Sequence, residues 1–174
     1  GLDLITLDPK HSGSLIGREA FADEQTLLSV ARRLAVDIGA MNQEGCVNAR
    51  VVHVESGTDP EGIARAETLG RLTFEALQGL PDHLSTPHKA FDRELKDEID
   101  GLAFVDDEYR VYGGRSNEGA IIVSRSPNPV DFSRMLACRV SNIVPVDHVE
   151  KRVRISGVVV AEGLVDVDGV MADE

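Results

Sequence analysis

The sequence predicts an α/β domain in which a β-sheet is flanked by helices in three layers. Amphipathic helical segments alternate with apolar strand-like runs in the first half of the chain, and the second half is richer in strands. Hydrophobic residues make up 42% of the 174 residues, whereas aromatic residues make up 4% and tryptophan is absent. A core of valine, leucine, isoleucine and alanine suits a sheet covered by helices. The length fits a single domain, residues 1–174.

Three segments have the pattern of helices. Residues 23–39 repeat apolar side chains at helical spacing. A second helix is expected to begin at Thr58, which would cap it, because Glu61 completes a capping box, and to end near residue 79. Residues 86–100 predict a third helix that is strongly charged and more exposed.

Strands are expected where apolar and β-branched residues form short runs between turns. The expected strands are residues 4–7, 49–54, 109–112, 120–123, 137–146 and 155–160. The sequence opens directly on one of these runs, so we interpret it as a piece excised from a longer protein. A short native N-terminal strand is the alternative.

The charge and the cysteine content narrow the class of protein. With 30 acidic and 18 basic residues the formal charge is -12, which disfavours nucleic acid and anionic membranes as partners. No apolar run approaches the ~20 residues of a membrane span, and the start does not have the pattern of a signal peptide. The two cysteines are far apart in sequence, so we expect free thiols in a cytoplasmic protein.

Cys46 has the most distinctive chemical setting in the chain. It follows the polar run Asn42-Gln43-Glu44-Gly45 and precedes the expected strand 49–54. A thiol on a turn with free backbone N–H groups can act as a nucleophile, because those groups can bind a developing oxyanion. The alternative is a small buried residue at the start of a strand. Asn42, Gln43 and Asn48 could orient the thiol or a substrate carbonyl, or make ordinary turn hydrogen bonds.

The run from Asn42 to Cys46, followed by Ala49-Arg50-Val51-Val52-His53-Val54, resembles the nucleophile segment of the aldehyde dehydrogenase superfamily. There an Asn-Gln-rich turn delivers the catalytic cysteine at the start of a strand. Leu7-Asp8-Pro9-Lys10-His11-Ser12 resembles the Leu-Gly-Gly-Lys stretch upstream of that cysteine. The sequence is more similar still to the acyl-CoA reductase branch, typified by the fatty-acid reductase of bacterial luminescence.

The similarity to that branch extends to a Ser-Pro turn at Ser126-Pro127 and to the Val-Pro-Val pattern at Val144-Pro145-Val146. It covers roughly residues 4–160 and implies a three-layer catalytic domain of aldehyde dehydrogenase type. Hydrolytic members carry a glutamate just before Leu-Gly-Gly-Lys, and the matching residue here is Thr6. Because threonine cannot act as a carboxylate base near neutral pH, this difference favours thioester chemistry over hydrolysis.

The resemblance therefore implies an acyl-CoA or acyl-carrier reductase that forms an acyl-cysteine and releases an aldehyde. It implies Cys46 as the catalytic residue. The implied substrate and oxyanion environment consists of Asn42, Gln43, Gly45, Val47 and Lys10. Lys10 could place an anionic group or be a solvated turn lysine. This sequence contains no Gly-x-Gly-x-x-Gly fingerprint of a dinucleotide site. The resemblance implies that NADPH or NADH would bind mainly in a domain absent from this chain.

Several alternatives stay open. The protein could be an NAD(P)-dependent aldehyde dehydrogenase that oxidises aldehyde to acid. It could instead be a non-catalytic assembly module, with a homo-oligomer formed through sheet edges in the stretches 137–146 and 155–160. Cys138 lies in an apolar strand pattern and is expected in the core. The five histidines have no metal-ligand spacing with either cysteine, so no metal site is expected.

Overall fold

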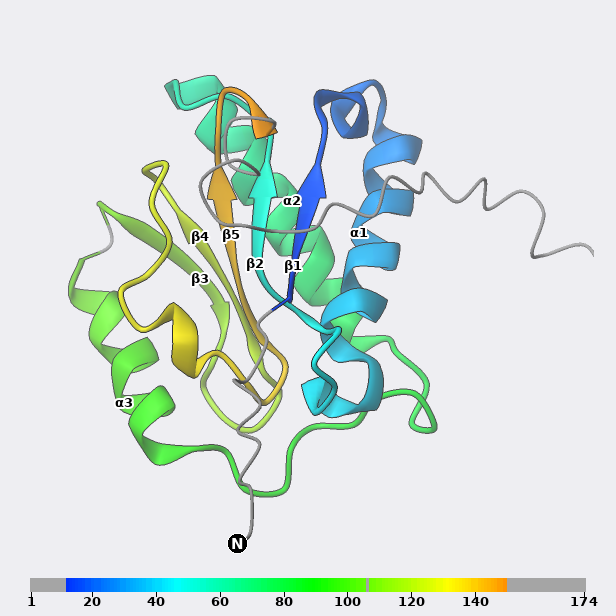
Figure 1. The fold of residues 1–174 in the computed structure, drawn as a ribbon, viewed down its shortest axis with the longest axis vertical. Coiled ribbons are helices and arrows are strands. Elements are labelled where there is room, and N and C mark those ends of the chain that lie inside the picture. The colour runs from blue at the N-terminus through cyan, green and yellow to red at the C-terminus, as the bar shows by residue number, and fades with distance from the viewer. Residues whose placement is uncertain (1–11, 106, 150–174) are drawn as a thin grey trace, which may run out of the picture.

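Five strands form one mixed sheet in the computed structural model, which describes residues 12–105 and 107–149 (Figure 1). The strands are β1 (Ser12–Ile16), β2 (Ala49–Val54), β3 (Tyr109–Gly113), β4 (Ala120–Ser124) and β5 (Val140–Pro145). The α-helices are α1 (Glu24–Gly39), α2 (Pro60–Gln78) and α3 (Arg93–Gly101). Short 3₁₀ helices are η1 (Arg18–Phe21), η2 (Ala40–Gln43), η3 (Leu102–Phe104) and η4 (Ser133–Met135).

The strand order is β1-β2-β5-β4-β3, and only the β3–β4 pair is antiparallel. The mixed α/β class predicted from the sequence is confirmed. The order also corrects one expectation, because β5 lies between β2 and β4. The stretch 137–146 therefore contains an interior strand and cannot supply a free sheet edge. The expected strands 4–7 and 155–160 lie outside the described residues.

Side-chain caps determine where the helices begin. Asp23 caps α1 by accepting a hydrogen bond from the Thr26 backbone amide at 2.7 Å. The expected cap of α2 at Thr58 is wrong by one residue, because Asp59 accepts from the Gly62 amide at 2.6 Å. The expected start of α3 at residue 86 is also wrong, because Asp92 caps that helix and residues 79–92 form an irregular connection.

Helices α1 and α2 cover one face of the sheet and enclose its main core (Figure 1). Apolar side chains from α1 and α2 pack there against alternate residues of the strands, among them Val52, Ile121 and Ile143. A Cβ added at Gly70 would lie 2.4 Å from Val123 Cγ2. Only glycine therefore permits α2 to approach β4 this closely.

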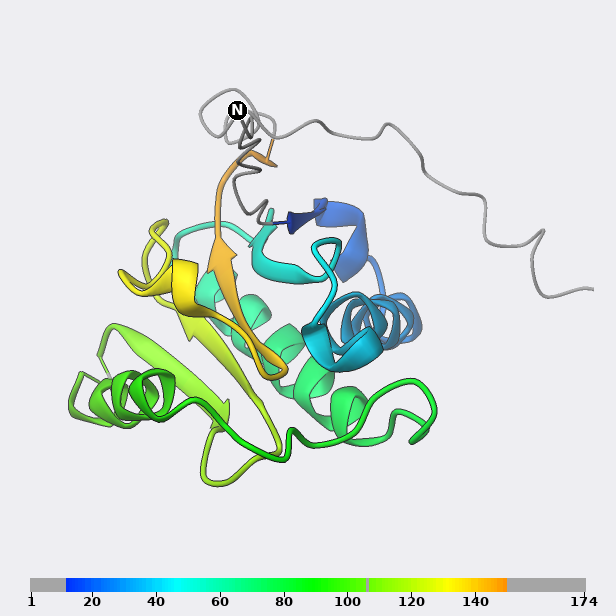
Figure 2. The same cartoon turned by 60° about the horizontal axis from the view of Figure 1, so that its bottom comes forward.

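The opposite face is covered by α3 and by the connection from β4 to β5, which includes η4 (Figure 2). The connection contributes Val130 and Leu136, and α3 contributes Leu95 and Ile99, to a second core cluster. Helices on one face and a helix plus a packed loop on the other make three layers. None of the helices within the described ranges is long and apolar enough to cross a membrane.

Candidate functional site

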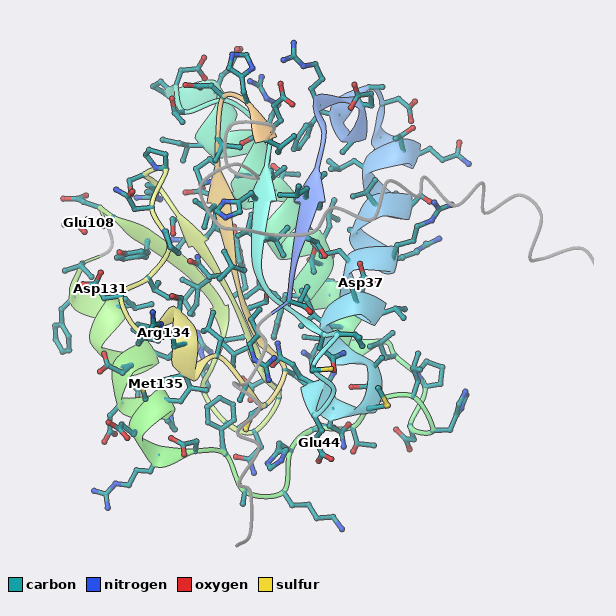
Figure 3. The ribbon with its side chains drawn as sticks, viewed as in Figure 1. Asp37, Glu44, Glu108, Asp131, Arg134 and Met135 are labelled. Carbon is teal, nitrogen blue, oxygen red and sulfur yellow. The ribbon has the colours of Figure 1, made fainter. Side chains whose placement is uncertain are left out.

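Cys46 lies on the turn that joins α1 to the amino end of β2, and its side chain is exposed. Figure 3 shows the neighbouring Glu44 on this turn, at the lower end of the molecule, and Asp37 higher on α1. The Ser12 hydroxyl at the start of β1 donates to the Cys46 carbonyl oxygen at 2.6 Å. Cys46 and Cys138 are both free thiols. Since cysteine is among the most buried residue types, an exposed one invites a chemical explanation.

Asn48 closes the turn around Cys46. Its side chain is 2% exposed, and its Oδ1 accepts from the Gly45 amide at 2.9 Å. Its Nδ2 donates to the carbonyl oxygens of Asp37 at 3.1 Å and Ala40 at 2.9 Å. One amide group thus satisfies both the turn and the unpaired carbonyls at the end of α1.

Gln43 joins the amino ends of two strands. Its Nε2 donates to the carbonyl oxygens of Ala49 at 3.1 Å and Val140 at 2.8 Å, and its Oε1 accepts from the Val140 amide at 2.9 Å. The side chain is 2% exposed. Gln43 therefore acts as a bridge between β2 and β5, on the interior side of the turn.

Asn42 ties the turn that carries Cys46 to the connection between α2 and α3. Its Oδ1 accepts from the Thr86 amide at 2.7 Å, and the Met41 amide donates to the Leu84 carbonyl at 2.9 Å. Both partners belong to the irregular connection between α2 and α3. The turn is consequently tied to four separate parts of the fold, namely α1, β1, β5 and this connection.

Left-handed backbone is concentrated at the amino ends of β2 and β5. Among the described residues, the non-glycine residues with positive φ are Met41, Asn42, Gln43, Cys138 and Arg139. The first three precede Cys46, and the last two form the turn before β5. Such conformations cost roughly 1–2 kcal/mol per residue and persist where the surroundings over-determine them, often at active sites.

Cys138 departs from its expected setting in one respect. It is buried, at 9% exposed, but it lies in a turn with φ of 58° rather than inside a strand. The left-handed conformation of Cys138 and Arg139 lets the chain enter β5 from the connection that carries η4. The strand itself starts two residues later than Cys138.

The other expected site residues have different settings. A Cβ at Gly45 would lie 2.9 Å from Asn48 Oδ1 and 3.0 Å from Met41 Cε, so a larger residue there would displace one of these two side chains. The Val47 side chain is 71% exposed. The backbone amides of Cys46 and Val47 donate no hydrogen bond to any described residue. Lys10 lies outside the described residues, as does Thr6.

Arg50, four residues after Cys46, was not among the site residues expected from the sequence. The register between β1 and β2 shifts at Ser12 and Gly13, which face Ala49 and Val51, so Arg50 is an extra residue in β2. Such a bulge redirects a side chain, and Arg50 Nε donates to the Leu136 carbonyl at 2.7 Å in the connection on the α3 side. It places a positive charge four residues after Cys46 in a strongly acidic chain.

The carboxyl ends of the parallel strands lie at the end of the sheet opposite to Cys46, where open α/β sheets usually bind ligands. A pocket of about 370 Å³ lies there, but its polar groups are largely engaged with one another. Glu55 forms an ion pair with Arg18, and Asp147 accepts from the amide and hydroxyl of Thr58 at 3.0 and 2.9 Å. The Arg18 hydrogen bond lowers the pKa of the Glu55 carboxyl below its ordinary value, although burial opposes it.

Two further features bear on cofactors. The Gly113–Gly119 segment joins antiparallel β3 to β4, so it is a hairpin loop rather than the strand-to-helix turn that holds a dinucleotide phosphate. Within residues 12–105 and 107–149, no cluster of three or more histidine, cysteine or acidic side chains could hold a metal ion.

A pocket of about 610 Å³ lies between α1 and α2, and Cys46 is not among the residues that line it. No protein-family model matches the chain, and no curated protein matches it.

Proposed function

We propose that this chain carries the reactive thiol of an acyl-CoA or acyl-carrier reductase. The observation that supports the proposal most strongly is an exposed thiol on a turn held by three buried or half-buried amide side chains, Asn42, Gln43 and Asn48. Nucleophiles require this kind of fixed presentation, since a displacement of about 1 Å can cost ~100-fold in rate.

In the proposed reaction, the Cys46 thiolate attacks the thioester carbonyl carbon. The carbon–sulfur bond to the carrier breaks, and an acyl-cysteine remains. The carrier leaves as a thiolate that takes a proton from water, which balances the proton that the Cys46 thiol released to water on ionising. The free amides of Cys46 and Val47 would stabilise the oxyanion, and one such donor is typically worth ~100–1000-fold in rate. Arg50 would attract the phosphate groups of the anionic substrate.

NADPH or NADH, bound mainly by a further domain as the resemblance implies, would supply the hydride that reduces the acyl-cysteine to an aldehyde. Aldehyde oxidation to acid is the alternative for the same thiol, and it additionally requires a base that activates water. Steady acid production by the intact enzyme would overturn our preference for thioester reduction.

Acyl transfer to the thiol can be tested on this chain alone. The protein is incubated with a long-chain acyl-CoA and its intact mass is measured, in wild type and in the Cys46→Ala and Cys138→Ala variants. We expect an acyl adduct in wild type and Cys138→Ala, but none in Cys46→Ala. An adduct that persists in Cys46→Ala, or its absence from all three proteins, would count against the proposal.

A module for assembly through sheet edges is a second candidate, favoured by the surroundings of β3. This strand forms one edge of the sheet, and a pocket of about 280 Å³ lies between it and α3. Just before β3, Phe104 is 89% exposed and Val105 is 40% exposed. Exposed edges accept partner strands. Light scattering of wild type and Phe104→Ser would test this, with an oligomer in the former and a monomer in the latter; monomers in both would exclude it.

A further inference from the structure

Arg139 is an arginine in the interior of the domain. Its side chain is 2% exposed and ranks among the largest fully buried side chains. One guanidinium nitrogen donates to the Leu77 carbonyl in the last turn of α2, and Nε has no hydrogen-bond partner among the described residues. No described carboxylate forms an ion pair with it.

A buried charge without a counter-ion is costly, and an apolar side chain of similar volume would fill the space with less penalty. The contact with α2 offsets part of this cost, because the carboxyl end of a helix carries a partial negative charge. The stabilising contact with α2 therefore offsets only part of the free-energy cost of burying the guanidinium. The segments that Arg139 connects give a better reason for an arginine at this position.

Arg139 holds the left-handed turn that leads into β5. Its φ is 67°, and its carbonyl oxygen accepts from the Ala120 amide at 3.2 Å. The guanidinium ties the same residue to α2. Arg139 is thus held from both sides, and it directly precedes Val140, the first residue of β5.

Val140 in turn meets the bridge to the thiol. Both its amide and its carbonyl bond the side chain of Gln43, at 2.9 and 2.8 Å. Gln43 is the last of the three left-handed residues before Cys46. An unbroken series of contacts thus runs from α2 through Arg139, Val140 and Gln43 to the turn that carries the thiol.

We propose that Arg139 is a positioning residue for Cys46, acting through Val140 and Gln43. The catalytic part of this inference rests on the proposed function, whereas the structural part does not. Loss of the guanidinium would release the turn before β5 and loosen the contacts of Gln43 with Val140. Residues 41–43 could then leave the left-handed conformation that precedes Cys46. Couplings of this kind typically change a rate or an equilibrium about 2- to 30-fold.

The experiment compares Arg139→Met with Arg65→Met as a matched control. Arg65 Nε also donates to a backbone carbonyl, that of Ser56, at 3.0 Å. This contact lies at the carboxyl ends of the strands, away from Cys46. Native-state hydrogen exchange of residues 41–48 is measured by mass spectrometry, together with the rate at which acyl-CoA acylates Cys46. We expect about 2- to 30-fold faster exchange and correspondingly slower acylation in Arg139→Met, with neither change in Arg65→Met.

Arg139→Lys serves as the second variant in case the methionine variant does not fold. Lysine keeps the charge but has a single nitrogen, so we expect an intermediate effect on exchange. Unchanged exchange of residues 41–48 in every Arg139 variant that folds, or equal changes in Arg65→Met, would overturn the inference. If wild type is not acylated at all, the proposed function fails, while the exchange comparison still decides whether Arg139 positions the turn.

Discussion

Replacement of Asn48 tests whether the Cys46 turn is held as the structure indicates. Asn48→Ala removes three hydrogen bonds, to the Gly45 amide and to the carbonyls of Asp37 and Ala40, from a side chain that is 2% exposed. Each such bond contributes about 0.5–1.5 kcal/mol net. Because some of the freed backbone groups will find water, we expect a loss of roughly 2–4 kcal/mol in the free energy of unfolding.

Urea denaturation followed by circular dichroism measures the loss as a lower midpoint at an unchanged slope. Asn48→Asp refines the test, because the carboxylate keeps the acceptor for Gly45 but faces two carbonyl oxygens without a proton to donate. It should be at least as destabilising as alanine. Asn117→Ala is the control, since its exposed side-chain bond to the Lys89 carbonyl is long, at 3.4 Å.

We expect less than about 0.5 kcal/mol for the control. The prediction is contradicted if Asn48→Ala lowers the free energy of unfolding no more than Asn117→Ala does, or if Asn48→Asp is as stable as wild type. Either result would mean that the turn does not depend on this amide.

Three further predictions concern other parts of the fold. The pKa of the Glu55 carboxyl is lower in the folded protein than its ordinary value of 4.5, so the ionised carboxylate stabilises the fold above that pH. This stabilisation is lost as the pH falls through the lower pKa of the folded state. Glu55→Gln should therefore flatten the decline of unfolding free energy below about pH 5. Gly70→Ala should destabilise by about 1–3 kcal/mol in urea denaturation, because the methyl group would overlap a valine of β4. In native protein, a thiol reagent should modify Cys46 rapidly and Cys138 only on unfolding, as peptide mass spectrometry would show.

Each of these has a matched control. Glu61→Gln alters a side chain that is 88% exposed, and the pH dependence should match wild type. Gly101→Ala adds a Cβ with no atom within 4 Å, so helix propensity alone should stabilise the protein by about 0.5–1 kcal/mol. A Glu55→Gln curve parallel to wild type, a neutral Gly70→Ala, or equal modification of both thiols would contradict the corresponding prediction.

Local patterns in the sequence predicted most of the elements. The helical spacing of residues 23–39 reproduces α1, and the apolar run 49–54 is β2, because both depend on neighbouring side chains that share one face. The helix beginnings were harder. Thr58 and Asp59 are both good caps, and the choice of Asp59 follows once Thr58 bonds Asp147, which is 89 residues away.

Local residue patterns were enough to predict a cysteine after a polar, glycine-containing turn at the entrance to a strand, and an alternation of helices with strands. Contacts between distant segments were not predictable in this way. The fold places β5 inside the sheet, bridges Gln43 to Val140 across 97 residues and buries Arg139 against α2. Strand order and buried polar contacts depend on pairings between distant segments, and no local pattern of side chains encodes which segments will meet.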